Sequence, residues 1–458
     1  MLQNILASKI GKDERSVIVL VGSQWGDEGK GKVSDSITQY LKKDEYIVVG
    51  PNGGGNAGHN VVIAKSASTG EKIKLAFHEL PGGAVAAEHI FLAQGRIVNF
   101  KNLVKEIEQI ELHQPNSNRK VFVASRSIVN IDGVYNMIEQ VSEDARGAHK
   151  VGSTKQGIGP AYAGEALRSA ITTGQLLTLS AEDLKTKIEG LCAIFPYLQA
   201  DDVHKNVLEI RELVKQVIEK EKLVLVSDDF LTSDIERAKD KHILIEGSQS
   251  VGLGKFGGAY PNNTSSDCSV HGLLSSCLLP KADFVCAVSK AIVSKVGGGR
   301  FANKLEDNGI PLDFVDEYRN TAGEYGATTG RPRQVGFFDA VQIKHSFKTG
   351  NRPDLLWINM GDMLKLFSDR GQKNKIVVGY KVNRFDPMSG GRVLVELKDS
   401  IPLQEDEIQE IVFEDLPDVK DLNTDLALWL DVVREKIDFK GPVVVGVGPG
   451  GDENVLFG

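Results

Sequence analysis

Residues 17–32 read VIVLVGSQWGDEGKGK, and this stretch decides the fold class. Its first five residues are β-branched or aliphatic and predict a short buried strand. A glycine-rich turn follows, and a helix is predicted from about Lys32. A strand, a glycine-rich loop and a helix in that order open a doubly wound sheet. The stretch therefore predicts an α/β fold. We expect a large, mostly parallel central sheet flanked by helices, a phosphate-loop-like first strand–loop–helix and smaller α+β elaborations.

The rest of the chain supplies further elements for such a sheet. Short apolar runs that predict strands lie at Tyr46–Val49, Val61–Ile63, Arg119–Ala124, His242–Glu246 and Phe284–Val288. Helical spacing with charge on one face indicates solvated helices over Asp183–Lys222. Lys375–Lys381 and Gly391–Leu397 look antiparallel, which predicts the smaller α+β part. We see neither repeats nor a linker, so residues 1–458 are interpreted as one large domain with insertions.

Composition narrows the class of protein. Of 458 residues, 41% are hydrophobic and 25% charged, which is a globular balance and excludes disorder as the main state. The formal charge of −8 disfavours a general nucleic-acid binder but not a nucleotide binder, because a phosphate site needs only local donors. No apolar run approaches the roughly 20 residues that span a bilayer, and residues 1–16 contain no apolar signal-peptide core. We therefore expect a cytoplasmic protein with no membrane partner.

The four cysteines, Cys192, Cys268, Cys277 and Cys286, form no Cys-x-x-Cys pair and have no matching histidine spacing. They are expected to be buried or incidental thiols in a reducing compartment. The 48 glycines are more informative, because they exceed the average share of about 7%. They gather beside Lys, His, Asn and Arg, as anion sites built from backbone amides require.

The loop at residues 22–32 has the features of a phosphate site. Its glycines let backbone N–H groups converge on oxyanions, and Lys30 adds a point charge. The loop is not a Walker A motif, because it is longer, lacks the Ser/Thr after Gly-Lys and contains Asp27. A carboxylate among phosphates is repulsive unless a cation neutralises it or it takes a proton. Asp27 is therefore a metal ligand, a general base or both; the alternative is an Asp that only shapes the turn.

A second glycine-rich segment, residues 52–60, reads NGGGNAGHN. Of nine histidines only His59 lies in such a loop, where the glycines imply close approach of the backbone to a ligand. We expect His59 to be catalytic and the other eight histidines to be ordinary core or surface residues.

The two loops together resemble those of the adenylosuccinate synthetase family. The resemblance continues, in the family's order, through four more blocks: GSTKQGIGPAY at 152–162, EGSQ at 246–249, YPNNTSS at 260–266 and GATTGRPR at 326–333. Six blocks in order over about residues 16–450 make this a specific match.

The resemblance implies a carbon–nitrogen ligase of purine biosynthesis that joins L-aspartate to IMP with GTP hydrolysis. In that chemistry, removal of the N1 proton lets O6 of the purine attack the γ-phosphoryl group. The aspartate amine then displaces the 6-phosphoryl group, giving adenylosuccinate, GDP and phosphate. By resemblance Asp27 is the N1 base and a Mg²⁺ ligand, the Gly58 carbonyl completes the metal shell, and His59 is the acid. Lys30 clamps phosphate in a loose transition state.

The resemblance also assigns the substrate-binding residues. Gln249 belongs to both the catalytic and the acceptor set, and Arg168 is expected to reach the partner's site in a homodimer. The acceptor nucleotide would contact Asn56, Thr154, Arg168, Gln249, Thr264 and Arg331. Aspartate would be held by Thr328, Thr329 and Arg331, whose fork suits a dicarboxylate. The donor nucleotide would be held by Gly26, Gly29, Lys30, Gly31, Lys32, Arg333, Met360, Asp362, Gly446 and Gly448.

Several residues depart from the family pattern. Met360 stands where the guanine-reading run usually has Lys, so GTP is the expected donor and ATP the alternative. Around the acceptor, Gly55, Asn60 and Gln156 replace a common His, Thr and Arg. A divergent member acting on a 2-aminopurine or deoxy nucleotide such as dGMP is therefore an alternative, although retention of Asp27 favours IMP.

Two readings from other classes stay open. A non-catalytic nucleotide sensor would bind without making product, and the changed pocket residues motivate it. A switch GTPase is less compatible with the sequence, because the Walker Ser/Thr is missing and the arginine loop would go unused.

Overall fold

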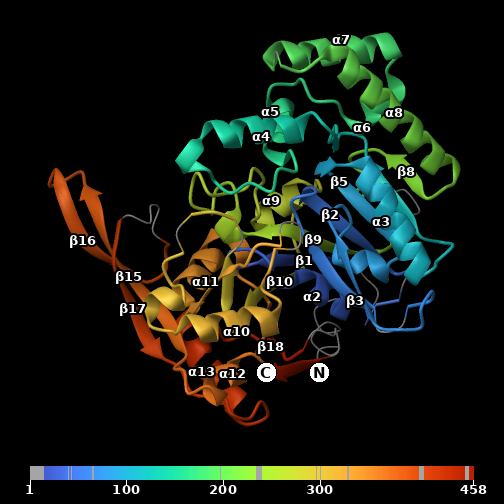
Figure 1. Cartoon of the computed structure of the whole chain (residues 1–458). Helices are drawn as coiled ribbons and strands as arrows, with labels where there is room; N and C mark the ends of the chain where they lie inside the picture. The colour runs from blue at the N-terminus through green and yellow to red at the C-terminus, as the bar shows by residue number, and fades with distance from the viewer. Residues whose placement is uncertain are drawn as a thin grey trace.

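The computed structural model describes residues 15–39, 41–42, 44–63, 66–195, 197–233, 240–295, 297–299, 301–326, 330–401, 407–448 and 453–457 (Figure 1). Its centre is a large sheet with the strand order β19-β18-β14-β10-β1-β9-β2-β5-β6-β8, while β7 pairs with β5. All of these pairings are parallel except that of β18 with β19. The strands are β1 (Val17–Gly22), β2 (Tyr46–Gly53), β5 (His89–Val98), β6 (Lys120–Ala124), β7 (Ile128–Val129), β8 (Leu223–Val226), β9 (His242–Ser250), β10 (Phe284–Lys290), β14 (Leu355–Asn359), β18 (Val443–Gly446) and β19 (Asn454–Phe457).

Helices cover both faces of this sheet. Successive residues of β1 point to opposite faces, so Ile18 and Leu20 belong to one hydrophobic core and Val19 and Val21 to the other. The first core includes side chains from α2 (Lys30–Thr38), α3 (Phe100–His113), α4 (Tyr135–Ala145), α5 (Ile158–Ala166), α6 (Thr173–Thr178), α7 (Ala181–Ile194) and α8 (Ala200–Glu219). The second includes side chains from α9 (Val270–Ser275), α10 (Leu312–Ala322), α11 (Ala340–Ser346), α12 (Leu364–Asp369) and α13 (Asp425–Ile437).

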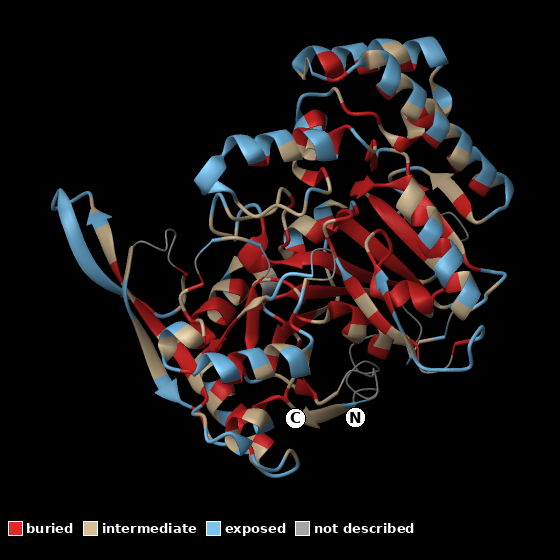
Figure 2. Ribbon diagram, viewed as in Figure 1, coloured by how far each residue is buried: buried red, intermediate tan, exposed pale blue. Residues whose placement is uncertain are grey.

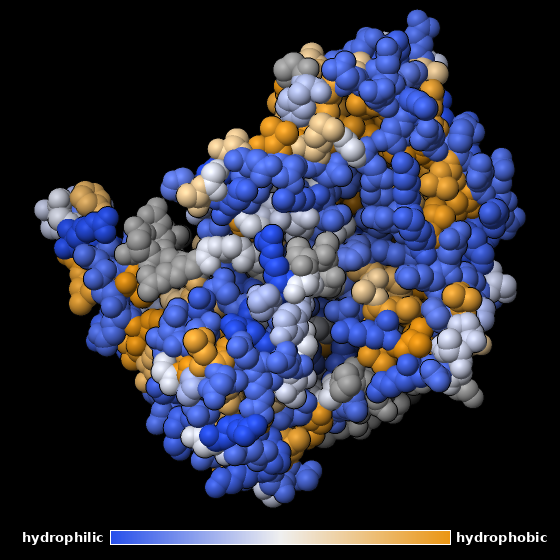
Figure 3. Space-filling view, in the orientation of Figure 1, coloured by the Kyte–Doolittle hydropathy of each residue, from blue (hydrophilic) through white to orange (hydrophobic). Residues whose placement is uncertain are grey.

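Burial follows this layering. The central strands are buried almost throughout, whereas the helices alternate buried and exposed residues (Figure 2). A parallel sheet buried on both faces needs near-continuous apolar runs, and the short β-branched runs of the sequence supply them. Hydrophilic side chains prevail on the face drawn in Figure 3, where apolar atoms form scattered patches.

Three small sheets surround the large one. β3 (His59–Ile63) pairs antiparallel with β4 (Ile73–Phe77), and β11 (Val293–Lys295) with β12 (Gln334–Gly336). The third sheet contains β13 (Phe338–Asp339), β15 (Lys375–Asp386), β16 (Gly391–Leu397) and β17 (Ile408–Asp415), and its β15–β16 ribbon projects as an arm at the left of Figure 1. The antiparallel pairing predicted between the segments after residues 375 and 391 is confirmed.

The fold class is confirmed, with small differences at element ends. α2 begins at Lys30 rather than at Lys32, and β9 runs past Glu246 to Ser250. The carboxyl ends of β1, β2, β9, β10, β14 and β18 share one edge of the sheet, because the strands are parallel. In open α/β sheets ligands bind outside that edge. Among the described residues, no helix is long and apolar enough to cross a membrane.

Candidate active site

The phosphate-loop-like segment leaves β1 at Gly22 and enters α2 at Lys30. Gly26, Asp27 and Gly29 have positive φ values of 94°, 58° and 86°, so the chain turns sharply through left-handed conformations. The first turn of α2 contains no acidic residue and no side-chain cap. The amino end of α2 thus meets the loop without an acidic side chain or a side-chain cap, and the amino end of a helix favours anions.

Glu28, which is fully buried, holds this loop together from inside. Its Oε1 accepts hydrogen bonds from the backbone N–H groups of Gln24 (3.2 Å) and Gly26 (3.0 Å). Its Oε2 accepts from Lys30 Nζ at 3.0 Å and from Ser250 Oγ at 2.5 Å. The carboxylate thereby fixes both the loop and the ammonium group that is expected to face phosphate.

Asp27, whose side chain is one-fifth exposed, is the most exposed member of a network of charged side chains. Its Oδ2 pairs with Arg333 and lies 3.5 Å from Lys290 Nζ. Both cations also contact buried Glu324, at 2.6 Å for Lys290 and 3.1 Å for Arg333. Burial alone would raise the pKa of Asp27, but Lys290, Arg333 and Lys30 outweigh it and lower the pKa. Asp27 is therefore ionised and oriented before any ligand arrives.

His59 forms a buried pair with Glu246. Its Nδ1 lies 2.6 Å from Glu246 Oε1, and the side chains are 3% and 0% exposed. Burial alone would raise the pKa of Glu246, but His59 outweighs it and lowers the pKa to about 2. His59 Nε2 has no hydrogen-bond partner among the described residues. The carboxylate thus fixes the ring and leaves Nε2 to meet a ligand.

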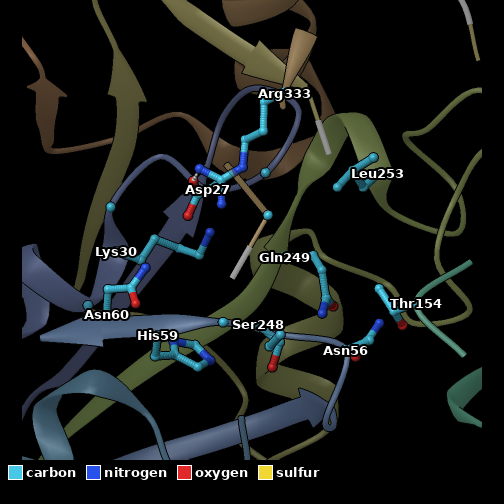
Figure 4. Close-up of a pocket in the computed structure, with 16 residues that line it drawn as sticks. Asp27, Lys30, Asn56, His59, Asn60, Thr154, Ser248, Gln249, Leu253 and Arg333 are labelled. Carbon is cyan, nitrogen blue, oxygen red and sulfur yellow. Dashed lines mark ion pairs between the residues drawn. The ribbon is translucent and has the colours of Figure 1, made fainter. Parts of the chain in front are cut away.

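These groups line one pocket (Figure 4). Asp27 and Arg333 lie at the top of the view, Lys30 and His59 at the left, and Asn56, Thr154 and Gln249 at the right. The described residues that line it are Gly26, Asp27, Gly29, Lys30, Gly31, Asn56, Ala57, Gly58, His59, Asn60, Thr154, Ser248, Gln249, Leu253, Gly326 and Arg333. The structure therefore brings together most of the catalytic residues and phosphate-loop glycines expected from the sequence.

The expected acceptor residues continue into an adjoining pocket. Asn56, Thr154 and Gln249 line both pockets, and Thr264 lines the second. Asn56 Nδ2 donates to Thr264 Oγ1 at 3.4 Å. The side-chain oxygen and nitrogen of buried Gln249 have no partner among the described residues. Unpaired buried amide groups at a pocket wall are what a polar ligand would satisfy.

The expected base-binding residues of the donor gather at the ends of β14 and β18. Gly361 N donates to Gly446 O at 2.8 Å, which joins the two strand ends. Lys32 Nζ donates to Gly448 O at 2.5 Å, so Lys32 lies at this donor corner rather than among the pocket-lining residues. Burial, the largest influence, raises the pKa of half-buried Asp362. Met360, with φ of 65°, accepts from Tyr318 Oη at 3.8 Å.

Other expected residues lie outside these pockets. Arg168 is exposed after α5, with φ of 63°, and its carbonyl accepts from Lys187 Nζ at 3.2 Å. Arg331 is exposed, and its carbonyl accepts a hydrogen bond from Gly326 N at 2.8 Å. Thr328 and Thr329 lie outside the described residues.

Sequence reasoning missed four charged residues of the site: Glu28, Glu246, Lys290 and Glu324. Each is buried, and each pairs with a residue that was expected to act. A signal existed for two of them: Glu246 directly follows the apolar run at 243–245 of β9, and Lys290 is the last residue of β10. His78, which was expected to be an ordinary residue, supports the second glycine loop: its Nδ1 lies 2.7 Å from Ala57 O.

The fold is an α/β sheet of mostly parallel strands, with a pocket that gathers Asp27, Lys30 and His59. A sequence model of the adenylosuccinate synthetase family matches residues 19–454. The chain therefore belongs to the adenylosuccinate synthetase family. Members of this family are ligases of purine biosynthesis that form a carbon–nitrogen bond and bind GTP, which implies a metal associated with the nucleotide.

Individual relatives agree. The adenylosuccinate synthetase of Exiguobacterium sibiricum is 33% identical over 464 residues, covering 96% of this chain and 98% of its own length. That of Streptococcus gordonii is 35% identical over 342 residues, covering 72% and 73%. The fully ligated enzyme of Plasmodium falciparum superposes with a TM-score of 0.78 at 26% identity, covering 97% of this chain and 100% of that one.

A more distant structure shares the fold alone. The succinoaminodeoxyadenylate synthetase of cyanophage S-2L, bound to dGMP and to dATP as an energy donor, has a TM-score of 0.57 at 17% identity. It covers 96% of this chain and 95% of that one.

Proposed function

We propose that this chain joins L-aspartate to IMP, using GTP, to give adenylosuccinate, GDP and phosphate. Asp27 takes the N1 proton of the purine, and O6 then attacks the γ-phosphoryl group of GTP. The bond between the γ-phosphorus and its bridging oxygen breaks and GDP leaves. The amine of aspartate displaces the phosphate from C6, and the departing phosphate carries the former O6.

The observation that carries this proposal is the convergence of Asp27, Lys30 and His59 on one pocket. Asp27 is a weak base by its pKa, so its effect must come mainly from position. Lys30, held by Glu28, is placed to stabilise charge on the transferred phosphoryl group. His59 Nε2 is free to donate a proton or hydrogen bond to the oxygen between purine and phosphorus.

The acceptor side is assigned to the two adjoining pockets. Asn56, Thr154, Gln249 and Thr264 offer amide and hydroxyl groups for the monophosphate and base. IMP is the proposed acceptor, because Asp27 places a carboxylate where the purine edge would lie. A guanine or deoxy nucleotide such as dGMP is the alternative.

Aspartate is assigned to the segment between Gly326 and Arg331. Gly326 lines the pocket, and its N–H donates to the Arg331 carbonyl, which ties Arg331 to a pocket residue. In this proposal Thr328, Thr329 and the Arg331 guanidinium hold the two carboxylates of aspartate. A guanidinium fork matches a carboxylate with two parallel bonds.

A magnesium ion fits the donor set of the pocket. Among the described residues no group of three or more His, Cys, Asp or Glu side chains could hold a metal by itself. Mg²⁺ is commonly bound through one or two protein oxygens together with substrate phosphates. Asp27 and the Gly58 carbonyl, which line the same pocket, would supply those oxygens. Such an ion neutralises phosphate charge when it is bound.

GTP is the proposed donor and ATP the alternative. The Asp362 carboxylate can accept from N1 and N2 of guanine, whereas N1 of adenine would offer it no proton. Gly446 and Gly448 present backbone groups beside it, and Met360 offers an apolar surface. Gly26, Gly29 and Gly31 would hold the phosphates, with Arg333 near the ribose and Lys32 bracing the base loop.

We further propose a cytoplasmic homodimer built of single-domain subunits. The exposed position of Arg168 suits a residue that reaches a partner's acceptor site. The four cysteines are buried and free, which fits a reducing compartment. Both hydrophobic cores lie against the same sheet, which supports one domain over residues 1–458.

A coupled assay tests the proposal. IMP and dGMP are each paired with GTP and with ATP in the presence of L-aspartate and Mg²⁺, and the succinylated purine is measured by its absorbance and mass. The proposal expects product with IMP and GTP. Product only with dGMP or only with ATP would correct the acceptor or the donor. No product in any pairing, together with measurable nucleotide binding, would favour a sensor.

A further inference from the structure

A buried arginine lies beneath the acceptor loop. Arg96 is on β5 and only 1% exposed, among the largest fully buried side chains of the chain. A buried guanidinium is unfavourable unless hydrogen bonds or a counter-charge compensate it. Among the described residues no carboxylate pairs with it within 4.0 Å, and its Nε has no partner. Its four hydrogen bonds are therefore the main local interactions that offset the cost of burying its charge.

These four bonds join three segments that carry the acceptor side of the site. Nη1 donates to Asn52 O at 2.8 Å and to Ser248 Oγ at 2.7 Å. Nη2 donates to His78 O at 2.8 Å and to Glu79 O at 2.7 Å. Since β5 neighbours β2 and β2 neighbours β9, the guanidinium reaches across one strand to hold the next.

Each joined segment leads directly to residues of the pocket. Asn52 is the penultimate residue of β2, immediately before the loop with Asn56, Gly58 and His59. Ser248 precedes Gln249 and also donates to Asn52 O at 2.5 Å. At Gly53 an added Cβ would lie 2.8 Å from Ser248 Cβ, so the loop and β9 are already in close contact.

The third segment holds the middle of the same loop. His78, whose carbonyl accepts from Arg96, contacts Ala57 O through Nδ1 at 2.7 Å. Ala57 lies between Asn56 and Gly58. Arg96 therefore controls both the start of the loop, through Asn52, and its middle, through His78.

The environment of Arg96 leaves its positive charge in place. Burial raises the pKa of the neighbouring Glu79 carboxyl to about 8, although Arg96 opposes the shift. The Asn99 backbone also opposes the shift, but burial outweighs both influences. At neutral pH Glu79 is then mainly protonated, and the guanidinium remains a net cation below a loop assigned to an anionic nucleotide.

We propose that Arg96 is the positioning residue of the acceptor half: it fixes the strand ends from which Asn56, His59 and Gln249 meet the nucleotide, without touching the nucleotide itself. The inference rests on the proposed function, because it takes the acceptor to bind at these residues. It assigns a role to a residue that is outside both pockets and that no sequence motif indicates.

Arg119 provides a matched control. It is also a buried arginine (4% exposed) that clamps backbone, donating to Val85 O and to Gln114 O at 2.8 Å each. Its neighbours lie before β5 and β6, at the amino ends of the strands and away from the site. Arg119 is additionally paired with Glu111 at 2.8 Å. Loss of either arginine should destabilise the fold, but only Arg96 should affect the acceptor.

The experiment compares Arg96→Met, Arg96→Lys and Arg119→Met. We measure the melting temperature, kcat, the KM for IMP and for GTP, and the Kd of IMP by calorimetry. For Arg96→Met the KM and Kd of IMP should rise about 10- to 100-fold while the KM of GTP changes less than about 2-fold. Arg96→Lys keeps the charge and part of the bonding, so its values should lie between those of Arg96→Met and the wild type.

Arg119→Met should lower the melting temperature yet leave both KM values within about 2-fold of wild type. The inference is overturned if Arg96→Met changes both KM values equally or changes neither. If Arg96→Met does not fold, the same comparison of the KM for IMP with the KM for GTP is made with Arg96→Lys. Should the wild type bind IMP but make no product, the proposed function fails, while the Kd comparison still tests the role of Arg96.

Discussion

The proposed reaction centre and the donor-base side of this site are built in different ways. At the reaction centre, His59 and Lys30 are each held by a fully buried carboxylate, Glu246 and Glu28. On the donor-base side, Asp362 is only half-buried and is flanked by backbone groups of glycines. The part of the site where protons and a phosphoryl group are proposed to move thus has side chains that are held in place by ion pairs.

This difference indicates that one part of the site is built for catalysis and the other for recognition of the base. General acid–base and electrostatic catalysis depend on groups fixed near the reacting atoms before the reaction. Binding of a base by backbone groups and one carboxylate tolerates larger displacements of the protein groups than catalysis does. We therefore expect substitutions of Asp27 and of the carboxylates that hold His59 and Lys30 to reduce kcat, and substitutions on the donor-base side to change KM and the choice of donor.

The largest effect is expected for Asp27→Asn. The amide has nearly the same shape but cannot take the N1 proton, so kcat should fall about 10³-fold. Binding of IMP and GTP, measured by calorimetry, should stay within about 5-fold, because Lys30 and the loop amides remain. Activity within about 10-fold of wild type would contradict the role of Asp27 as base.

The next effect is expected for Glu246→Gln, which should lower kcat about 10²-fold by loosening His59. The pKa of Glu246 is lowered from 4.5 to about 2 in the folded chain. The pair therefore stabilises the fold fully above about pH 4.5, and this stabilisation is lost as the pH falls towards 2. Thermal melts between pH 3 and 7 should show a smaller acid-induced loss in the variant than in wild type.

Glu111→Gln is the matched control for that variant. Glu111 pairs with Arg119 at 2.8 Å, away from the pocket. Its substitution should leave kcat within about 2-fold. An equal loss of kcat in both variants would show that the Glu246 effect is not specific to His59.

A smaller effect is expected for Asp362→Asn on the donor-base side. An amide can still accept one hydrogen bond but no longer offers a charged acceptor to guanine. The ratio of kcat/KM for GTP to that for ATP should fall about 10-fold, with kcat for GTP little changed. Steady-state kinetics with both donors measure this; an unchanged ratio would exclude Asp362 as the guanine reader.

The smallest effect on activity is expected for Glu79→Gln, which mainly changes the stability of the fold. The pKa of Glu79 rises from 4.5 unfolded to about 8 folded, so the folded state retains a proton that the unfolded state loses. The stability that protonated Glu79 gives the wild-type fold therefore falls as the pH rises from about 4.5 to 8. Glutamine removes this loss and should stabilise the chain at pH 8 by up to roughly 4 kcal/mol, with little gain at pH 4. A pH-independent difference in chemical denaturation would contradict the shift.

The sequence predicted this site where its residues are consecutive. The two glycine loops, with Asp27, Lys30 and His59, are recognisable because each motif is local, and the apolar runs predict the sheet. Of their partners, Glu28 lies in the first loop itself, whereas Glu246 and Lys290 are single residues in buried strands. Whether Glu246 or Arg96 meets a given loop depends on strand order and register, which no local pattern encodes. The aspartate-binding threonines and the reach of Arg168 stay predictions.

The central claim is that O6 of the purine is phosphorylated before aspartate displaces it. Incubation of the wild-type chain with [6-¹⁸O]IMP, GTP, L-aspartate and Mg²⁺ tests this directly, with mass spectrometry of the inorganic phosphate formed. The account predicts one ¹⁸O atom in each phosphate released with adenylosuccinate. Unlabelled phosphate, with the ¹⁸O recovered in water, would contradict it.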